Sequence, residues 1–151
     1  MTPNTAASVH QRLLNLARAE GRRFNDLLQH YALELWLYRL SQSTHRDQFI
    51  LKGALMLVAW ELPISRPTRD IDFLARAENS LDIIAGMIAD ICVADAVDDG
   101  MVYDAASIKT SRIVEDATYA GVRATFNGTL GRAKARMQVD VGFSDTVTPG
   151  P

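Results

Sequence analysis

The sequence predicts an α+β domain in which helices come first and an antiparallel set of strands comes last. Apolar residues fall at helical spacing through the first third of the chain, and the stretch from Phe24 to Leu40 contains neither proline nor glycine. Apolar and polar residues alternate strictly near the C-terminal end, which is typical of half-buried strands. We therefore expect a helical lead-in over residues 1–45, packed on a core over residues 46–151.

Several helices follow from this spacing. The first covers residues 6–19 and ends before Gly21, and the second runs from Phe24 to Leu40 with apolar side chains around much of its circumference. A helix-prone run over residues 54–60 follows the Lys52-Gly53 pair. Another helix is expected after Asn79-Ser80, because both are typical N-cap residues. Its apolar side would consist of Leu81, Ile84, Ala85, Ile88 and Ile91.

Strands are predicted in two regions. A short apolar run, Phe49–Leu51, precedes the glycine turn, and residues 70–75 ("DIDFLA") alternate so that two aspartates share one face. The later strands are expected over residues 107–114, 120–126 and 132–143 as an antiparallel meander. The hairpin loop of the last two is expected over residues 127–132 ("NGTLGR"), with Asn127-Gly128 and a second glycine, Gly131. The alternation is cleanest in the last strand, where the following residues share one face: Ala133, Ala135, Met137, Val139 and Val141.

Composition places the chain among ordinary globular proteins. It has 151 residues, 48% hydrophobic and 23% charged, with a net charge of −2 and a pI near 5.9. Any contact with a polyanion must therefore come from a local basic patch. A single cysteine, Cys92, lies in an apolar run and is expected in the core, which fits a reducing compartment. No signal-peptide pattern or long apolar run is present in the sequence, so we expect a cytoplasmic protein without a membrane partner.

The chemistry-bearing residues begin with Asp70 and Asp72. On a strand, carboxylates at i and i+2 point to the same side with Cβ atoms about 7 Å apart, a separation that a divalent cation with oxygen ligands can bridge. A phosphoryl-transfer site needs a further carboxylate from a neighbouring strand, and Asp140 on the polar face of the last strand is the candidate. We expect the three carboxylates to converge within about 4–6 Å.

A phosphate site is predicted close by. Lys52, Gly53 and Ala54 place a glycine at a strand-to-helix turn, where backbone N–H groups and the helix dipole favour an anion. The basic loop before the aspartates adds donors suited to triphosphate oxygens, from Arg66, Thr68 and Arg69.

Each of these features has a plain structural alternative. Asp70 and Asp72 could be solvated carboxylates at a strand end, the glycine turn could be only a turn, and Arg66 and Arg69 could balance the aspartates at the surface. Asp140 could be an exposed residue paired with Arg136 or Lys134, and Asp145 is the next candidate if Asp140 faces the wrong way. The order of the features favours the functional interpretation: glycine turn, helix, basic loop, D-x-D strand, then an aspartate flanked by valines.

That order resembles the nucleotidyltransferase superfamily of the DNA polymerase β type. The segments "FILKGALML", "RPTRDIDFL" and "ARMQVDVGFSD" resemble the AbiEii/AbiGii toxin family more closely, and the helical start of the chain is similar to that family's N-terminus. The resemblance implies the α/β nucleotidyltransferase fold with a mixed, largely antiparallel central sheet. It also implies that the chain corresponds to the N-terminal half of such proteins, without their mostly helical C-terminal half.

The resemblance further implies an activity and partners. Asp70, Asp72 and Asp140 would be the catalytic and metal-binding residues, holding Mg²⁺ or Mn²⁺, with a nucleoside triphosphate (NTP) at the Gly53 turn. The acceptor would be an RNA, such as tRNA, or a protein, and a cognate antitoxin would control the toxin. Ala54 departs from the superfamily, which has a serine there, so Lys52, Thr68 or backbone amides would have to contact the phosphate instead.

Three functional hypotheses remain open at this stage. The first is a metal-dependent nucleotidyltransferase of the toxin type. The second is a non-catalytic module with the same fold that binds a partner protein or RNA, and the third is an α+β domain whose aspartates are only solvated. His10, His30 and His45 lack ligand spacing and are expected to have no catalytic role.

Overall fold

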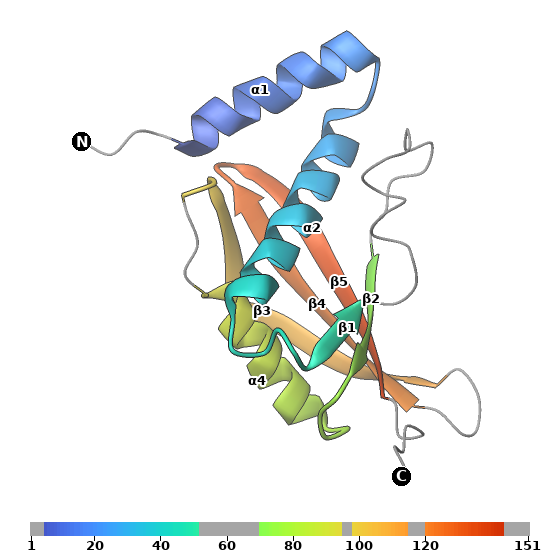
Figure 1. The fold of residues 1–151 in the computed structure, drawn as a ribbon. Helices are drawn as coiled ribbons and strands as arrows, with labels where there is room; N and C mark the ends of the chain where they lie inside the picture. The colour runs from blue at the N-terminus through green and yellow to red at the C-terminus, as the bar shows by residue number, and fades with distance from the viewer. Residues whose placement is uncertain (1–4, 52–69, 95–97, 115–119, 144–151) are drawn as a thin grey trace.

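A computed structural model of the chain describes residues 5–51, 70–94, 98–114 and 120–143. Their helices are α1 (Thr5–Glu20), α2 (Phe24–Gln42) and α4 (Leu81–Cys92). Their strands are β1 (Phe49–Leu51), β2 (Asp70–Ala75), β3 (Met101–Val114), β4 (Ala120–Leu130) and β5 (Ala133–Phe143) (Figure 1). The predicted helix over residues 54–60 lies outside the described residues.

The three described helices confirm the helical predictions. Helix α1 buries one side through Val9, Leu13 and Ala17, at the predicted spacing. Helix α4 begins as expected, because the Ser80 hydroxyl accepts a hydrogen bond of 3.3 Å from the backbone N–H of Ile83. None of the helices in the described ranges is long and apolar enough to cross a membrane.

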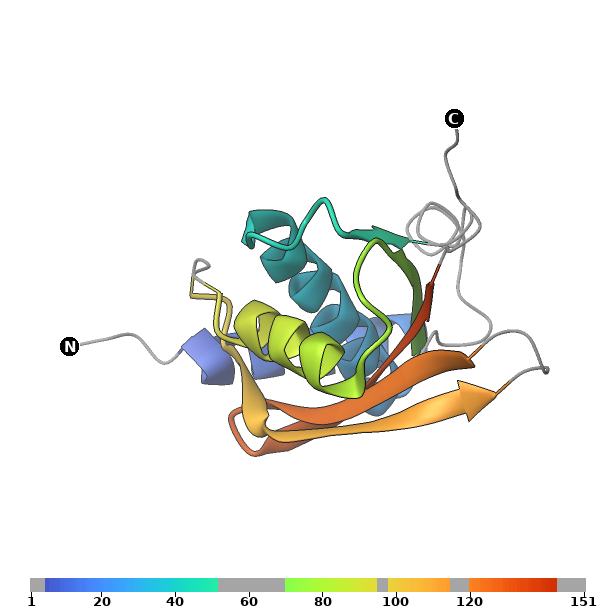
Figure 2. The same ribbon diagram turned by 90° about the horizontal axis from the view of Figure 1, so that it is seen from below.

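The strands form one sheet in the order β1-β2-β5-β4-β3. Strand β2 pairs in parallel with β5, whereas the β1–β2, β5–β4 and β4–β3 pairs are antiparallel. Helices α2 and α4 lie over the same face of the sheet, and Figure 2 shows the two layers from the side. This arrangement confirms the expected α+β fold with a mixed, largely antiparallel sheet.

The β4–β5 hairpin turn is shorter than the loop predicted over residues 127–132. Asn127 and Gly128 lie inside β4, and the turn is formed by Gly131 and Arg132, with Gly131 at φ 62°. A positive φ is needed at the first central residue of a tight hairpin turn, and glycine meets that need without strain. Gly128 has a different role, because a Cβ there would lie 3.1 Å from both Met101 and the Tyr103 ring on β3. The turn therefore lies at the second glycine of the predicted loop, and the prediction is wrong at Asn127-Gly128, where the glycine serves packing.

Strand β3 is longer than the sequence predicts. It begins at Met101, six residues before the expected start, and its register against β4 shifts between Asp104 and Lys109. Such an irregularity inserts extra residues into one strand and interrupts the alternation of apolar and polar side chains. The first part of β3 therefore gives no clear strand pattern in the sequence.

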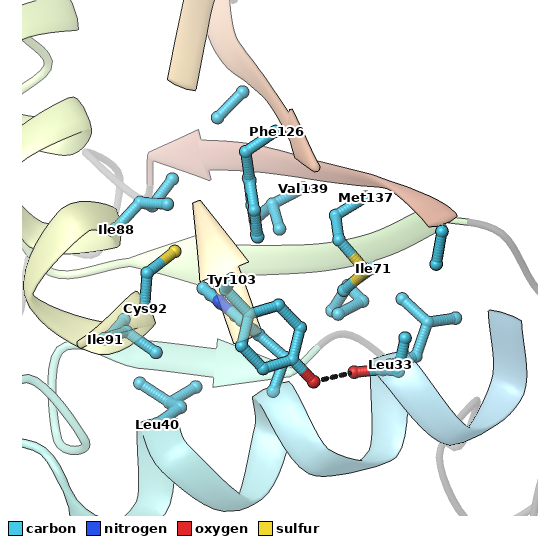
Figure 3. Packing of buried hydrophobic residues seen from close by; sticks show 14 of the residues in the cluster. Leu33, Leu40, Ile71, Ile88, Ile91, Cys92, Tyr103, Phe126, Met137 and Val139 are labelled. Carbon is cyan, nitrogen blue, oxygen red and sulfur yellow. Dashed lines mark hydrogen bonds between the residues drawn. The ribbon is translucent and has the colours of Figure 1, made fainter. Parts of the chain in front are cut away.

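One hydrophobic core joins the helices to the sheet. Trp36 of α2 is fully buried, with its ring centroid 6.2 Å from that of Phe73 on β2 and 5.7 Å from that of Phe126 on β4. Cys92 is buried in the same cluster, among Ile88, Ile91 and their neighbours (Figure 3), as predicted. Burial raises the pKa of the Cys92 thiol to about 11, so the thiol stays protonated and unreactive at neutral pH.

A buried ion pair fastens α2 to the start of β3. Arg39 and Asp99 are both buried, and the Arg39 Nη2 lies 2.9 Å from the Asp99 Oδ1. The same guanidinium lies over the Tyr103 ring, 4.6 Å from its centroid, and the Tyr103 hydroxyl donates to the Ala32 carbonyl (Figure 3). These contacts orient the entry to β3 against the helical layer.

A second polar contact, the His45–Asp90 pair, joins the α2–β1 connection to α4. His45 Nε2 lies 2.8 Å from Asp90 Oδ2, and His45 Nδ1 lies 3.0 Å from Gln48 Oε1. Desolvation lowers the pKa of His45, but the hydrogen bonds to Asp90 and Gln48 and the charge of Asp90 outweigh it, so the pKa is raised. The His45–Asp90 pair is therefore strongest when the imidazole is protonated.

We predict that Gly131→Ala lowers the free energy of unfolding by about 1–2 kcal/mol, the cost of placing a side chain at a left-handed position. The nearest atom to an added Cβ there is the Ala6 Cβ at 3.8 Å, so the effect is due to backbone strain alone. Urea denaturation measures it. Asn127→Ala is the control and should lower the free energy of unfolding less. A larger loss for Asn127→Ala than for Gly131→Ala would indicate that the turn lies at Asn127-Gly128 instead.

We also predict a pH-dependent contribution from His45. The pKa of His45 is raised in the folded state. The stability that the His45–Asp90 pair contributes is therefore fully present below pH 6.5, the ordinary pKa of histidine, and is lost as the pH rises through the folded-state pKa. Because Asp90 is largely exposed, the loss should be less than about 1 kcal/mol. Asp90→Asn should flatten this part of the stability curve between about pH 6 and pH 8. Asp82→Asn, an exposed position on the same helix, should leave the curve unchanged, and equal slopes for all three proteins would contradict the prediction.

Candidate functional site

Asp72 and Asp140 lie side by side on the sheet. They are direct register partners in the parallel β2–β5 pair, whose backbones are separated by about 4.8 Å. Laterally paired residues project to the same side of a sheet, so both carboxylates belong to the face opposite the helices. The two acidic residues come from segments 68 positions apart in the sequence, and pairing of the strands brings them together.

Apolar neighbours determine which way these aspartates face. Ile71 and Phe73 on β2, and Val139 and Val141 on β5, are almost fully buried against the helical layer. Side chains alternate along a strand, so burying these four sends Asp72 and Asp140 to the other side. A slip of one residue in either strand would bury a carboxylate, and the hydrophobic pattern therefore specifies the register.

The remaining predicted site residues are placed only in part. Asp70 is the first residue of β2 and pairs with Gln138, two residues before the Asp72–Asp140 pair. The phosphate-site candidates lie outside the described residues, namely Lys52, Gly53, Ala54, Arg66, Thr68 and Arg69. Asp145, the alternative to Asp140, also lies outside them, and Asp140 has the orientation that the first choice requires.

Arg123 is the site residue that sequence reasoning missed. Its Nε lies 2.9 Å from the Asp140 Oδ1 and its Nη2 lies 3.1 Å from the Asp140 Oδ2, a bidentate ion pair across the β4–β5 ladder. The sequence had offered Arg136 or Lys134 as the partner of Asp140, and the observed partner is Arg123. The position of the hairpin turn explains this, because a two-residue turn at Gly131-Arg132 puts Arg123 directly opposite Asp140.

The row Asp72–Asp140–Arg123 crosses three strands and carries two negative charges and one positive charge. The Asp140 side chain is 19% exposed and that of Arg123 is 44% exposed, so the pair is partly screened by water. The guanidinium holds the Asp140 carboxylate in one orientation and leaves the Asp72 charge uncompensated within this row.

The acidic pair fits a hard divalent cation. Two neighbouring carboxylates offer the oxygen ligands that Mg²⁺ and Mn²⁺ prefer, and a cation relieves the repulsion between them. Among the described side chains, which do not include that of Asp70, no cluster of three acidic, histidine or cysteine residues is arranged to hold a metal ion. A complete site therefore needs Asp70 or another group in addition to Asp72 and Asp140.

Comparison with known proteins identifies the family. A family model described as the nucleotidyl transferase AbiEii toxin of a type IV TA system matches residues 36–151. The match covers well over half of the chain, so the chain belongs to the AbiEii nucleotidyl transferase toxin family. The resemblance inferred from the sequence is thereby confirmed.

Other comparisons add less. No match is found among curated proteins. Among solved structures, the chain is similar to a crystal structure of an H. pylori protein assigned as a nucleotidyltransferase, with 11% identity and a TM-score of 0.44. The similarity covers 81% of this chain and 47% of that one, so this chain spans about half the length of that protein.

We predict that Arg123→Ala lowers the free energy of unfolding by less than about 1 kcal/mol, because a partly exposed ion pair contributes little to stability. Arg136→Ala, an exposed arginine on the same face, is the matched control and should behave similarly. Urea denaturation at low and high salt measures both. A loss of several kcal/mol on Arg123→Ala alone would mean that the pair is needed to hold the sheet together.

Proposed function

We propose that this chain is the nucleotidyltransferase module of a toxin, which transfers a nucleotide from an NTP to an RNA or protein acceptor with Mg²⁺ or Mn²⁺ bound. The observation that carries the proposal is the direct pairing of Asp72 with Asp140 on one face of the sheet. Membership of the AbiEii family supports it. In this proposal Asp70, two residues before Asp72 on β2, completes the acidic group.

The acidic residues have a clear role in such a reaction. Asp70, Asp72 and Asp140 would hold the cation, which when bound supplies Lewis-acid chemistry and neutralises charge on the phosphates. The oxygen of the acceptor hydroxyl forms a bond to the α-phosphorus of the NTP, the bond from that phosphorus to the bridging oxygen breaks, and pyrophosphate leaves. The hydroxyl proton passes to a carboxylate oxygen of the acidic group. Arg123 keeps the Asp140 carboxylate oriented through its two hydrogen bonds.

The nucleotide would be held by the segment that precedes β2. We assign its phosphates to the Lys52-Gly53-Ala54 turn and to donors from Arg66, Thr68 and Arg69, whose residue types suit anionic oxygens. Arg66, Thr68 and Arg69 come directly before Asp70 in the chain, and Lys52 follows β1, whose last residue, Leu51, pairs with Phe73 on β2. A nucleotide bound by these residues would therefore lie near the start of β2. The missing hydroxyl at Ala54 makes the backbone amides and Lys52 the main contacts at the turn.

The biological setting follows from the family. A member of a toxin–antitoxin family implies a cognate antitoxin that restrains it, and we extend that partner to this chain. A buried, reduced Cys92 supports a cytoplasmic location. This chain spans about half the length of its structural neighbour, and the substrates and partners named here are proposed for the whole protein.

Labelled-NTP transfer tests the proposal. The chain is incubated with each of the four NTPs, Mg²⁺ or Mn²⁺, and total RNA or a protein extract, and label in each acceptor fraction is measured. Asp72→Asn and Asp140→Asn should each lower the transfer rate at least about 100-fold, the scale seen when one charge-stabilising group is removed. Asp104→Asn, an exposed acid on β3, is the matched control and should keep the wild-type rate.

Calorimetry with Mn²⁺ alone gives an independent readout. Both site variants should weaken Mn²⁺ binding relative to wild type and to Asp104→Asn, because each removes one oxygen ligand. Unchanged transfer in both variants would overturn the assignment of the site. NTP binding without any transfer by the wild-type chain would instead support the non-catalytic binding module.

A further inference from the structure

Arg123 engages both carboxylate oxygens of Asp140. The Arg123 Nε lies 2.9 Å from the Asp140 Oδ1 and the Nη2 lies 3.1 Å from the Oδ2, so one side of the guanidinium lies along the carboxylate. In the other direction across the sheet, Asp140 is the direct register partner of Asp72. Asp140 is therefore placed between a cation on β4 and a second carboxylate on β2.

The stability of the sheet does not explain this ion pair. A cross-strand pair whose arginine is 44% exposed contributes little to the free energy of folding. The β4–β5 ladder runs from Val122 to Leu130 on the β4 side, and its other face is buried in the core whether or not the pair forms, through Val122, Ala124, Val139 and Val141. The charge of Arg123 therefore matters more to its polar neighbours than to the fold.

The polar neighbours of Arg123 carry an excess of negative charge. Asp72 and Asp140 lie opposite each other on adjacent strands, an arrangement in which like charges are destabilising. On its other side Arg123 pairs in register with Ser111 of β3, which is neutral. Across β2, β5, β4 and β3, this row thus contains two carboxylates and one guanidinium, and Arg123 offsets part of the repulsion between the carboxylates.

We propose that Arg123 is an internal counter-cation of the acidic pair, which holds the Asp140 carboxylate in place before a divalent cation binds and lowers the affinity of the site for that cation. The proposal rests on the proposed function and adds to it a residue that controls how tightly the cation is bound. Each oxygen of a carboxylate has two lone pairs, so Asp140 can accept from Arg123 and still offer a metal ligand. Arg123 is a positioning residue here, because it acts through Asp140.

Two effects of Arg123 on cation binding oppose each other. Its hydrogen bonds fix the Asp140 carboxylate, and fixing the two torsions of an aspartate favours binding by about two- to threefold. Its positive charge repels a second cation on the same carboxylate. Unit charges about 5 Å apart at a partly hydrated site repel each other enough to weaken binding about tenfold. The repulsion is the larger effect, so removal of the charge should tighten binding.

Binding of Mn²⁺ to the full chain, without NTP or acceptor, tests the proposal by isothermal titration calorimetry. Arg123→Gln should bind Mn²⁺ about tenfold more tightly than wild type. Arg123→Lys keeps the charge without the planar fork and should stay close to the wild-type affinity. Arg136→Gln is the matched control on the same face, about 13 Å along β5 from Asp140, and should change the affinity less than about twofold, because 0.1 M salt screens charges beyond about 10 Å.

Thermal unfolding gives a second readout. A ligand that binds only the folded protein raises the Tm by an amount that grows with its affinity. The same Mn²⁺ concentration should therefore raise the Tm of Arg123→Gln by more than that of wild type or of Arg136→Gln. Arg123→Met keeps the aliphatic stem without the charge, and it replaces Arg123→Gln in both measurements if that variant does not fold.

The possible outcomes separate this proposal from the proposed function. Weaker Mn²⁺ binding by Arg123→Gln would overturn the counter-cation, because it would mean that Arg123 acts only by orienting the carboxylate, and unchanged binding would overturn it as well. An arginine with a purely structural role would not tighten Mn²⁺ binding when removed. If the wild type transfers no nucleotide, the proposed function fails, whereas tighter Mn²⁺ binding by Arg123→Gln and weaker binding by Asp140→Asn would still support the counter-cation.

Discussion

The parallel pairing of β2 with β5 is the constraint on which the rest of this structure depends. These strands are separated in the chain by α4, β3 and β4, yet their register places Asp72 beside Asp140. Ile71, Phe73 and Val139 on the other face hold that register, because a shift of one residue would bury charge and expose a core side chain. The hydrophobic effect on one face of the sheet therefore positions the carboxylates on the other.

The two faces of the sheet differ in character. The helix-covered face contains the aromatic cluster around Trp36 and the buried Arg39–Asp99 pair. The opposite face carries the acidic pair and Arg123, and its side chains are mostly polar and partly exposed. Substitutions of these exposed polar side chains leave the contacts of the core in place, so the proposed function can be tested without disturbing the fold.

Local patterns predicted most of the fold, and their failures have specific causes. Helices α1 and α4 and the last strand were predictable because each buries one side, which produces a clear period in the sequence. The early part of β3 was missed because its register shift interrupts the alternation. The hairpin loop was predicted to begin too early because Asn127-Gly128 is a strong turn signal, whereas Gly128 is needed where the Tyr103 ring packs closely.

By itself, the sequence determined that Asp72 and Asp140 would be on the polar faces of their strands, since alternation along one strand is a local property. Only the tertiary structure decided which residues lie across from them. A turn at Asn127-Gly128 would have put Glu115 opposite Asp140, whereas the turn at Gly131-Arg132 puts Arg123 there. The physical reason is that the pairing partner depends on the register of the whole hairpin, which packing around Gly128 and the backbone at Gly131 select together.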